Sequence, residues 1–169
     1  MRKLQFTNHE SKSLLVERLK DFPETILLGK NAEAPIRFAL TSEMSFGIGV
    51  CIGIGGAGFA GMVTPETQRV FIGHDCTVDV IDLVSRGVIQ SVDLVGPFYE
   101  FLERQPQSLV LALHELGLVV FAEDGSVVRE FYTPDIVEDW HVDGNFVSLS
   151  LSGSKKMKLN LSSGTAEIV

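Results

Sequence analysis

The residues best suited to chemistry are His74, Asp75 and Cys76, a compact polar cluster at the end of a predicted strand. A cysteine beside a histidine can become an activated nucleophile, because a nearby imidazole lowers the pKa of the thiol and accepts its proton. Successive strand residues point to opposite faces, so His74 and Cys76 would share a face that Asp75 does not. The group that orients such a pair would have to come from elsewhere. An aspartate-containing turn with a half-buried cysteine explains the same residues, and we favour that interpretation.

A second cluster consists of Asp139, Trp140, His141 and Asp143. On a strand, the two aspartates and His141 fall on one face, an arrangement that could hold a hard metal ion. Trp140 would then point inward as a core anchor. The run from Asp143 to Asn145 spells a hairpin turn, however, and a turn explains Asp143 without a metal. The sequence therefore predicts no metal site.

Residues 53–58 read GIGGAG, which matches the residue pattern of the dinucleotide-binding fingerprint. That fingerprint works only where a strand turns into a helix, because the helix terminus and neighbouring amides hold the pyrophosphate. Here Met62, Val63 and Thr64 lead into Pro65, and another strand follows. The chain also offers no serine–histidine–acid set, CxxC pair or P-loop. We expect no cofactor and no catalytic residues.

Residues 46–55 form the most informative predicted strand, in which large residues alternate with glycine or cysteine. Because strand side chains alternate in direction, one face is bulky and the other nearly bare. A bare face implies that something approaches it closely, and we expect the N-terminal helix or another backbone layer there. The alternative is a small-ligand-binding or hydrolytic pocket at this face. Its candidate residues are Gly49, Cys51, Gly53, His74 and Cys76.

One helix is predicted, over residues 10–20, with Thr7 or Asn8 as its cap and Pro23 ending the apolar pattern. Residues 44–65 carry no charge and are long enough for a membrane span. Their glycines and their alternation favour strands instead, so we predict no membrane segment.

The remainder of the chain repeats. Gly87, Gly125 and Gly164 are 38 and 39 residues apart, with similar sequences around them. Each is expected in a tight turn between two strands, with two more strands upstream. Four short antiparallel strands in each period of about forty residues are typical of a blade-type repeat. We predict a single mainly β domain, with a helix and glycine-rich strand region over residues 1–57 and three four-stranded blades over 58–169. A β-trefoil and a β-sandwich are the alternatives.

The segment TVDVIDLVSRGVIQSVDLVG, residues 77–96, resembles the outer hairpin of a YVTN-type β-propeller repeat. LVVFAEDGSVVREF is compatible with the same scheme, and MKLNLSSGTAEIV matches it more loosely. The resemblance implies a fold but no particular function, since propellers host enzymes, binding platforms and structural parts alike. A closed propeller typically has four to eight blades. Three blades therefore imply an open stack capped by the helix, or closure by a second subunit.

The formal net charge is −8 over 169 residues, which argues against nucleic-acid binding because that needs clustered Lys and Arg. Acidic turns can instead steer a basic protein partner. We assign this role to four residues: Glu123, Asp124, Asp139 and Asp143. The predicted function is a non-catalytic protein-interaction module, in one form a protein that neutralises a basic partner. Copies of the chain could also pair through sheet edges.

Two cysteines, Cys51 and Cys76, are too few for a disulfide framework. We therefore expect free thiols in a cytoplasmic protein, and a single bridge stays open as the alternative.

Overall fold

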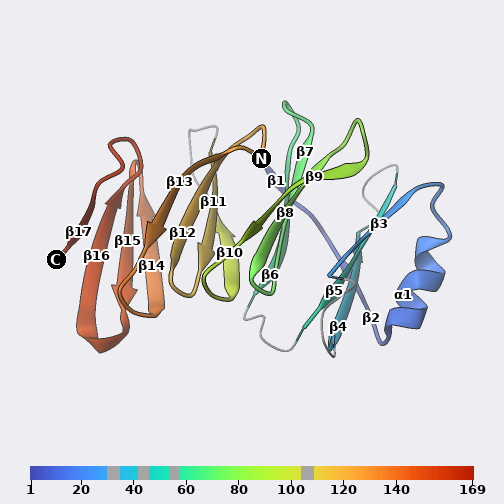
Figure 1. Ribbon diagram of the computed structural model, residues 1–169, viewed down its shortest axis with the longest axis horizontal. Helices are drawn as coiled ribbons and strands as arrows, with labels where there is room; N and C mark the ends of the chain where they lie inside the picture. The colour runs from blue at the N-terminus through green and yellow to red at the C-terminus, as the bar shows by residue number, and fades with distance from the viewer. Residues whose placement is uncertain (30–34, 42–45, 54–57, 104–108) are drawn as a thin grey trace.

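Strands dominate the computed structural model, which describes residues 1–29, 35–41, 46–53, 58–103 and 109–169. Three antiparallel sheets follow one another along the chain and stand side by side (Figure 1). The first blade contains β6 (Phe59–Thr64), β7 (Arg69–His74), β8 (Thr77–Asp82) and β9 (Gly87–Asp93), and β1 (Arg2–Lys3) pairs with β6. The second blade contains β10 (Phe98–Leu102), β11 (Leu109–His114), β12 (Gly117–Ala122) and β13 (Val127–Tyr132). The third contains β14 (Val137–Asp143), β15 (Phe146–Leu151), β16 (Lys155–Asn160) and β17 (Ala166–Ile168), with a 3₁₀ turn at Ser152–Ser154.

A fourth sheet, the N-terminal sheet, precedes the blades in the chain. It has the strand order β2 (Thr7–His9), β4 (Arg37–Thr41), β5 (Gly47–Ile52) and β3 (Thr25–Leu28), with β3 parallel to β5. The mainly β prediction is confirmed. Whether the three blades are copies of one sequence repeat stays a prediction.

Helix α1 (Lys12–Leu19) begins at Ser11, whose hydroxyl accepts a hydrogen bond from the backbone N–H of Leu14 at 3.3 Å. Capping by Thr7 or Asn8 was therefore wrong, because both residues belong to β2. In the part of the chain that is described, no helix is long and apolar enough to cross a membrane.

The helix covers the bare glycine face of β5, as predicted (Figure 1). A Cβ atom added at Gly49 would lie 2.9 Å from a methyl carbon of Leu19 and 3.2 Å from one of Leu15. At Gly47 it would lie 2.8 Å from the ring of Phe22. Glycine at these positions lets the helix approach the sheet closely.

Hydrophobic clusters fill the space between each pair of successive sheets. Strands in the middle of the stack pack on both faces, so β11 and β12 are buried along almost their whole length. In β15 and β16, by contrast, buried and exposed residues alternate. The third blade therefore turns a polar face away from the stack, with Ser148, Lys156 and Lys158 exposed on it.

Two of the three predicted turn glycines adopt the left-handed conformation, Gly125 at φ +98° and Gly164 at φ +77°. In the first blade the left-handed residue is Arg86, at φ +54°, and Gly87 is already the first residue of β9. The turn there lies one residue earlier than predicted.

Candidate functional site

His74 ends β7 and is 5% exposed, held between two carboxylates. Its Nε2 atom lies 2.9 Å from Oδ2 of Asp79, and its Nδ1 atom lies 3.3 Å from Oδ2 of Asp75. Ser91 donates to the other oxygen of Asp79. Burial alone would lower the pKa of His74, but the hydrogen bonds and charges of both aspartates outweigh it and raise the pKa. Both imidazole nitrogens are thus engaged in a network that binds the ring in place.

Cys76 lies in the turn after β7, so the favoured interpretation of an aspartate-containing turn is confirmed, but the cysteine is exposed and not half-buried. Asp75 has φ +46°, and His74 pairs directly with Thr77, so the chain reverses at Asp75 and Cys76. The shared face predicted for His74 and Cys76 was therefore wrong. Burial raises the pKa of the Cys76 thiol, and the charges of Asp75, Glu115 and Asp93 raise it further. This environment disfavours the thiolate that nucleophilic catalysis requires.

The glycine-rich strand is anchored at its end by the same turn. The backbone N–H of Gly53 donates to Oδ1 of Asp75 at 2.8 Å. Cys51 is fully buried with Leu15 and Leu19 under α1, and a ligand over Gly49 would have to displace both leucines. Both cysteines are free thiols. The rest of the GIGGAG run, residues 54–57, lies outside the described residues.

His74 lines a pocket of about 670 Å³. This pocket lies along β3, the edge strand of the N-terminal sheet, and not at the glycine face of β5. It opens between β3 and the first blade, and its polar lining includes His74, Asp75, Asp79 and Ser91. Neither Gly49 nor Cys51 lines it. Of the five predicted ligand residues only His74 lines this pocket, while Gly49 and Cys51 are covered by the helix and the exposed Cys76 lies in the turn.

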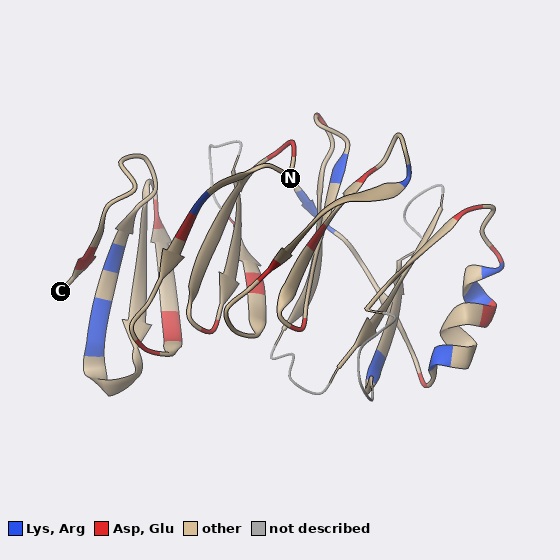
Figure 2. Cartoon of the chain, viewed as in Figure 1, with Lys and Arg blue, Asp and Glu red and all other residues tan. Residues whose placement is uncertain are grey.

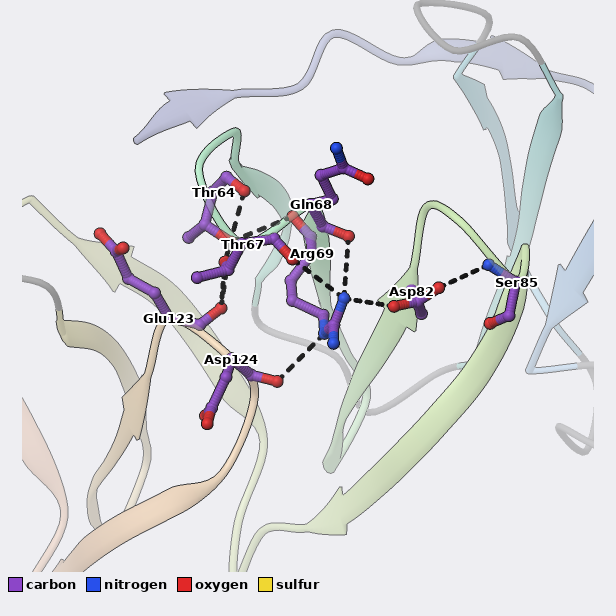
Figure 3. A network of polar contacts seen from close by, with 8 residues as sticks. All are labelled: Thr64, Thr67, Gln68, Arg69, Asp82, Ser85, Glu123 and Asp124. Carbon is purple, nitrogen blue, oxygen red and sulfur yellow. Dashed lines mark hydrogen bonds and ion pairs between the residues drawn. The ribbon is translucent and has the colours of Figure 1, made fainter.

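Glu123 and Asp124 use their backbone carbonyls to join two blades (Figure 3). Arg69 donates from Nε to the carbonyl of Asp124 at 3.1 Å and from Nη1 to the carboxylate of Asp82. The hydroxyl of Thr67 donates to the carbonyl of Glu123 at 2.6 Å. Hydrogen bonds from Ser126 lower the pKa of the Asp124 carboxyl. The β12–β13 turn is therefore clamped to the first blade, and a role for these two residues in partner binding stays a prediction.

Asp139, His141 and Asp143 are exposed on β14, as the alternation predicted. Within the described ranges, no group of three His, Cys, Asp or Glu residues could hold a metal ion. Trp140 points inward, as the pattern predicted, and packs against the core cluster between the second and third blades. It is half-buried, and its indole N–H donates to Oε1 of Glu100 at 2.8 Å.

An acidic edge, which we define as Asp75, Asp93 and Glu115, lies beside Cys76 where strands of the first and second blades end. Backbone hydrogen bonds fix its shape. The backbone N–H of Leu94 donates to the carbonyl of Cys76 at 2.8 Å, and the backbone N–H of Glu115 donates to the carbonyl of Pro97 at 2.9 Å. Acidic residues colour the lower turns of these blades in Figure 2, whereas basic residues gather on β16. The edge concentrates negative charge from two blades on a rigid frame.

Beside this edge lies an aromatic pocket of about 420 Å³, which sequence reasoning missed. It is lined by five residues of β10 and β14: Tyr99, Glu100, Val137, Glu138 and Trp140. The rings of Tyr99 and Trp140 are stacked, with centroids 6.0 Å apart and planes at 29°. Burial raises the pKa of Tyr99, and the charge of Glu115 adds to the rise. The backbone N–H of Val137 donates to the carbonyl of Glu115 at 2.8 Å, so the pocket lies next to the acidic edge. The one sequence signal was the rarity of these residues, since the chain has one Trp and two Tyr.

Comparison with known proteins identifies the fold. No family model and no curated protein matches the sequence. The structure is similar to the β-propeller domain of Cps50 (Swd1) from Myceliophteria thermophila, with a TM-score of 0.50 and 13% identity over 69% of this chain. It also matches the N-terminal domain of Nup159 (TM-score 0.43, 11% identity, 63% of this chain and 32% of that one) and Hsv2 from Kluyveromyces lactis (0.39, 9%, 64% and 35%).

These sheets are β-propeller-type blades, so the resemblance inferred from residues 77–96 is confirmed at the level of the fold. The chain covers 38% of the Cps50 propeller domain. At this identity the likeness concerns the fold alone.

Proposed function

We propose that the chain is a non-catalytic protein-interaction module that binds a basic segment of another protein along the acidic edge. The observation that carries this proposal is the placement of Asp93 and Glu115, from two blades, near the exposed Cys76, with Asp75 next to it in the same turn. A rigid surface of one charge sign steers an oppositely charged partner and raises its association rate. The net charge of −8 acts in the same direction.

The chemistry of the cluster of His74, Asp75 and Cys76 supports a binding role over catalysis. His74 is engaged at both nitrogens, and the pKa of Cys76 is raised. A cytoplasmic location is part of the proposal, because two free thiols fit a reducing compartment.

The test is capture of partners from a lysate of the source organism with matched variants as bait. The double variant Asp93→Asn/Glu115→Gln removes two charges from the edge and keeps the side-chain shapes. Asp139→Asn/Asp143→Asn removes two charges from the exposed face of β14 and is the matched control. We expect a stoichiometric basic protein on the wild type and on the control, but not on the edge variant.

Added salt should weaken the same complex, because the screening length falls from about 10 Å at 0.1 M to about 3 Å at 1 M. Equal capture by all three baits would contradict the proposal. Loss with the β14 variant alone would move the interface to Asp139 and Asp143, as the sequence suggested.

A second candidate is small-ligand binding in the 670 Å³ pocket beside β3, which the convergence of His74, Asp79 and Ser91 on it favours. This function requires a metabolite-sized compound that raises the melting temperature of the wild type and not that of His74→Gln. A panel of polar metabolites measured by thermal shift tests it.

A further inference from the structure

We propose that the aromatic pocket of β10 and β14 receives the guanidinium group of an arginine from the basic partner. The inference rests on the proposed function and deepens it, because it names the side chain that the partner contributes. The pocket adjoins the acidic edge, because the backbone N–H of Val137, which lines the pocket, donates to the carbonyl of Glu115 at 2.8 Å. A basic segment lying along the edge can therefore place one side chain between the two blades.

The aromatic walls supply the first half of the recognition. Tyr99 and Trp140 are both half-buried, so each ring has one part packed and one part open to the pocket. A cation over the face of Trp or Tyr is attracted by the ring quadrupole, most strongly over Trp. The two rings stack on each other with centroids 6.0 Å apart, and because a planar group between them would need about 7 Å, the guanidinium group would lie against the open part of one ring.

The carboxylates supply the second half. The indole N–H of Trp140 donates to one oxygen of Glu100 at 2.8 Å and so fixes the direction of that carboxylate. Glu138 is exposed at the rim. An ionised acceptor that is already oriented forms stronger hydrogen bonds than a mobile one, because less side-chain entropy is lost.

Among the described residues that line the pocket there is no Lys or Arg. Lys3 and Arg37 lie on the other side of Glu100, where they line an adjoining pocket with Tyr99 and Glu100, and the Nζ atom of Lys3 pairs with Oε1 of Glu103 at 3.0 Å. The exposed carboxylate of Glu138 is therefore the partner that an incoming cation would meet in the aromatic pocket.

Arginine fits this site better than lysine. The guanidinium group is planar, stacks on aromatic faces, and donates two parallel hydrogen bonds to a carboxylate. An ammonium group is a compact, strongly hydrated point charge, so it gains less binding energy from contact with a flat aromatic surface.

The experiment uses Trp140, the only tryptophan in the chain, as its reporter. N-acetylarginine amide is titrated into the intact protein and Trp140 fluorescence is followed. N-acetylcitrulline amide, which has almost the same shape without the charge, is the control probe. We expect saturable binding of the arginine probe with a dissociation constant on the order of 1 mM, and at least fivefold weaker binding of citrulline.

Variants locate the site. Glu138→Gln and Tyr99→Leu should each weaken arginine binding roughly two- to fivefold, as expected for one partly exposed ion pair or cation–π contact. Asp143→Asn, which removes the same charge from the same strand outside the pocket, should leave it unchanged. Thermal melts confirm that each variant is folded.

Equal binding of arginine and citrulline, or no binding to a folded wild type, would overturn the proposal. Equal binding of N-acetyllysine amide would overturn the preference for guanidinium. This outcome is independent of the capture experiment. If the probe binds while the edge variant captures its partner normally, the edge proposal fails and the pocket stands. If the probe fails while the edge variant loses its partner, only the pocket inference fails.

Discussion

His74 is the last residue of the second strand of the first blade, and His114 holds the same place in the second blade. Their surroundings shift their pKa values in opposite directions. His114 is completely buried, and its Nδ1 atom accepts a hydrogen bond from the N–H of Leu116 at 3.3 Å. Its Nε2 atom has no hydrogen-bond partner among the described residues. Burial lowers the pKa of His114 to about 4, against a smaller opposing effect of Glu130. The imidazole is therefore neutral in the folded protein at neutral pH.

The consequence is a loss of stability in acid. A histidine in the unfolded chain has a pKa near 6.5. Below this pH the unfolded state therefore binds a proton at this histidine, whereas folded His114 stays neutral down to about pH 4. The stability linked to His114 is fully present above pH 6.5 and is lost as the pH falls through about 4. Between pH 7.5 and 4.5 this linkage lowers the free energy of unfolding by about 2.5 kcal/mol. His74 has a raised pKa and acts with the opposite sign: its contribution is present below pH 6.5 and is lost as the pH rises through the raised value.

The assay is urea unfolding followed by fluorescence, at pH 7.5 and pH 4.5. His114→Leu removes the titration, so it should lose about 2.5 kcal/mol less than the wild type on acidification. His74→Gln should lose more than the wild type. His141→Gln, at an exposed position on β14, should follow the wild type. An equal loss in the wild type and in His114→Leu would refute the reasoning, since it would show that folded His114 accepts a proton near its ordinary pKa.

Two further predictions concern the joins between blades. Arg69→Ala removes the clamp of Figure 3 and should lower the free energy of unfolding by roughly 2 kcal/mol, because it breaks the ion pair with Asp82 and takes the donor from the carbonyls of Thr67 and Asp124. Arg18→Ala breaks an exposed pair with Asp21 and should cost less than about 1 kcal/mol, so equal effects would contradict the clamp. Gly73→Ala would place a Cβ atom 2.3 Å from the ring of buried Phe98 and should cost roughly 1–3 kcal/mol, whereas Gly87→Ala meets only Ser85 at 3.9 Å and should be near neutral. Urea unfolding of each variant measures these differences.

Features with short sequence periods were predictable. The alternation of large and small residues over 46–55 identified β5 and indicated that its glycine face would be covered, because strand side chains alternate in direction. The spacing of Gly87, Gly125 and Gly164 located the hairpins of the blades to within a residue. Both signals are periodic patterns of residue type along the chain, so a single sequence contains them in full.

The sites could not be predicted in the same way, because they depend on contacts between distant residues. Glu100 and Trp140 are forty residues apart and meet only when the second and third blades stack. The acidic edge likewise joins residues of two blades. The turn at Asp75 and Cys76 was the interpretation that the sequence favoured, and the positive φ of Asp75 excludes the alternative of a strand that continues through Cys76. Asp occupies left-handed positions more readily than most residues, but the sequence does not say which aspartate will do so.

The most direct test of the central claim is chemical-shift mapping with a basic peptide. The isotopically labelled protein is titrated with the peptide acetyl-Gly-Arg-Gly-Arg-Gly-amide at low salt. The account predicts shifts confined to the backbone amides around Cys76, Asp93 and Glu115 and to the indole N–H of Trp140, all reversed by added salt. Shifts centred on Glu123 or Asp143, or no shifts at any peptide concentration, would contradict it.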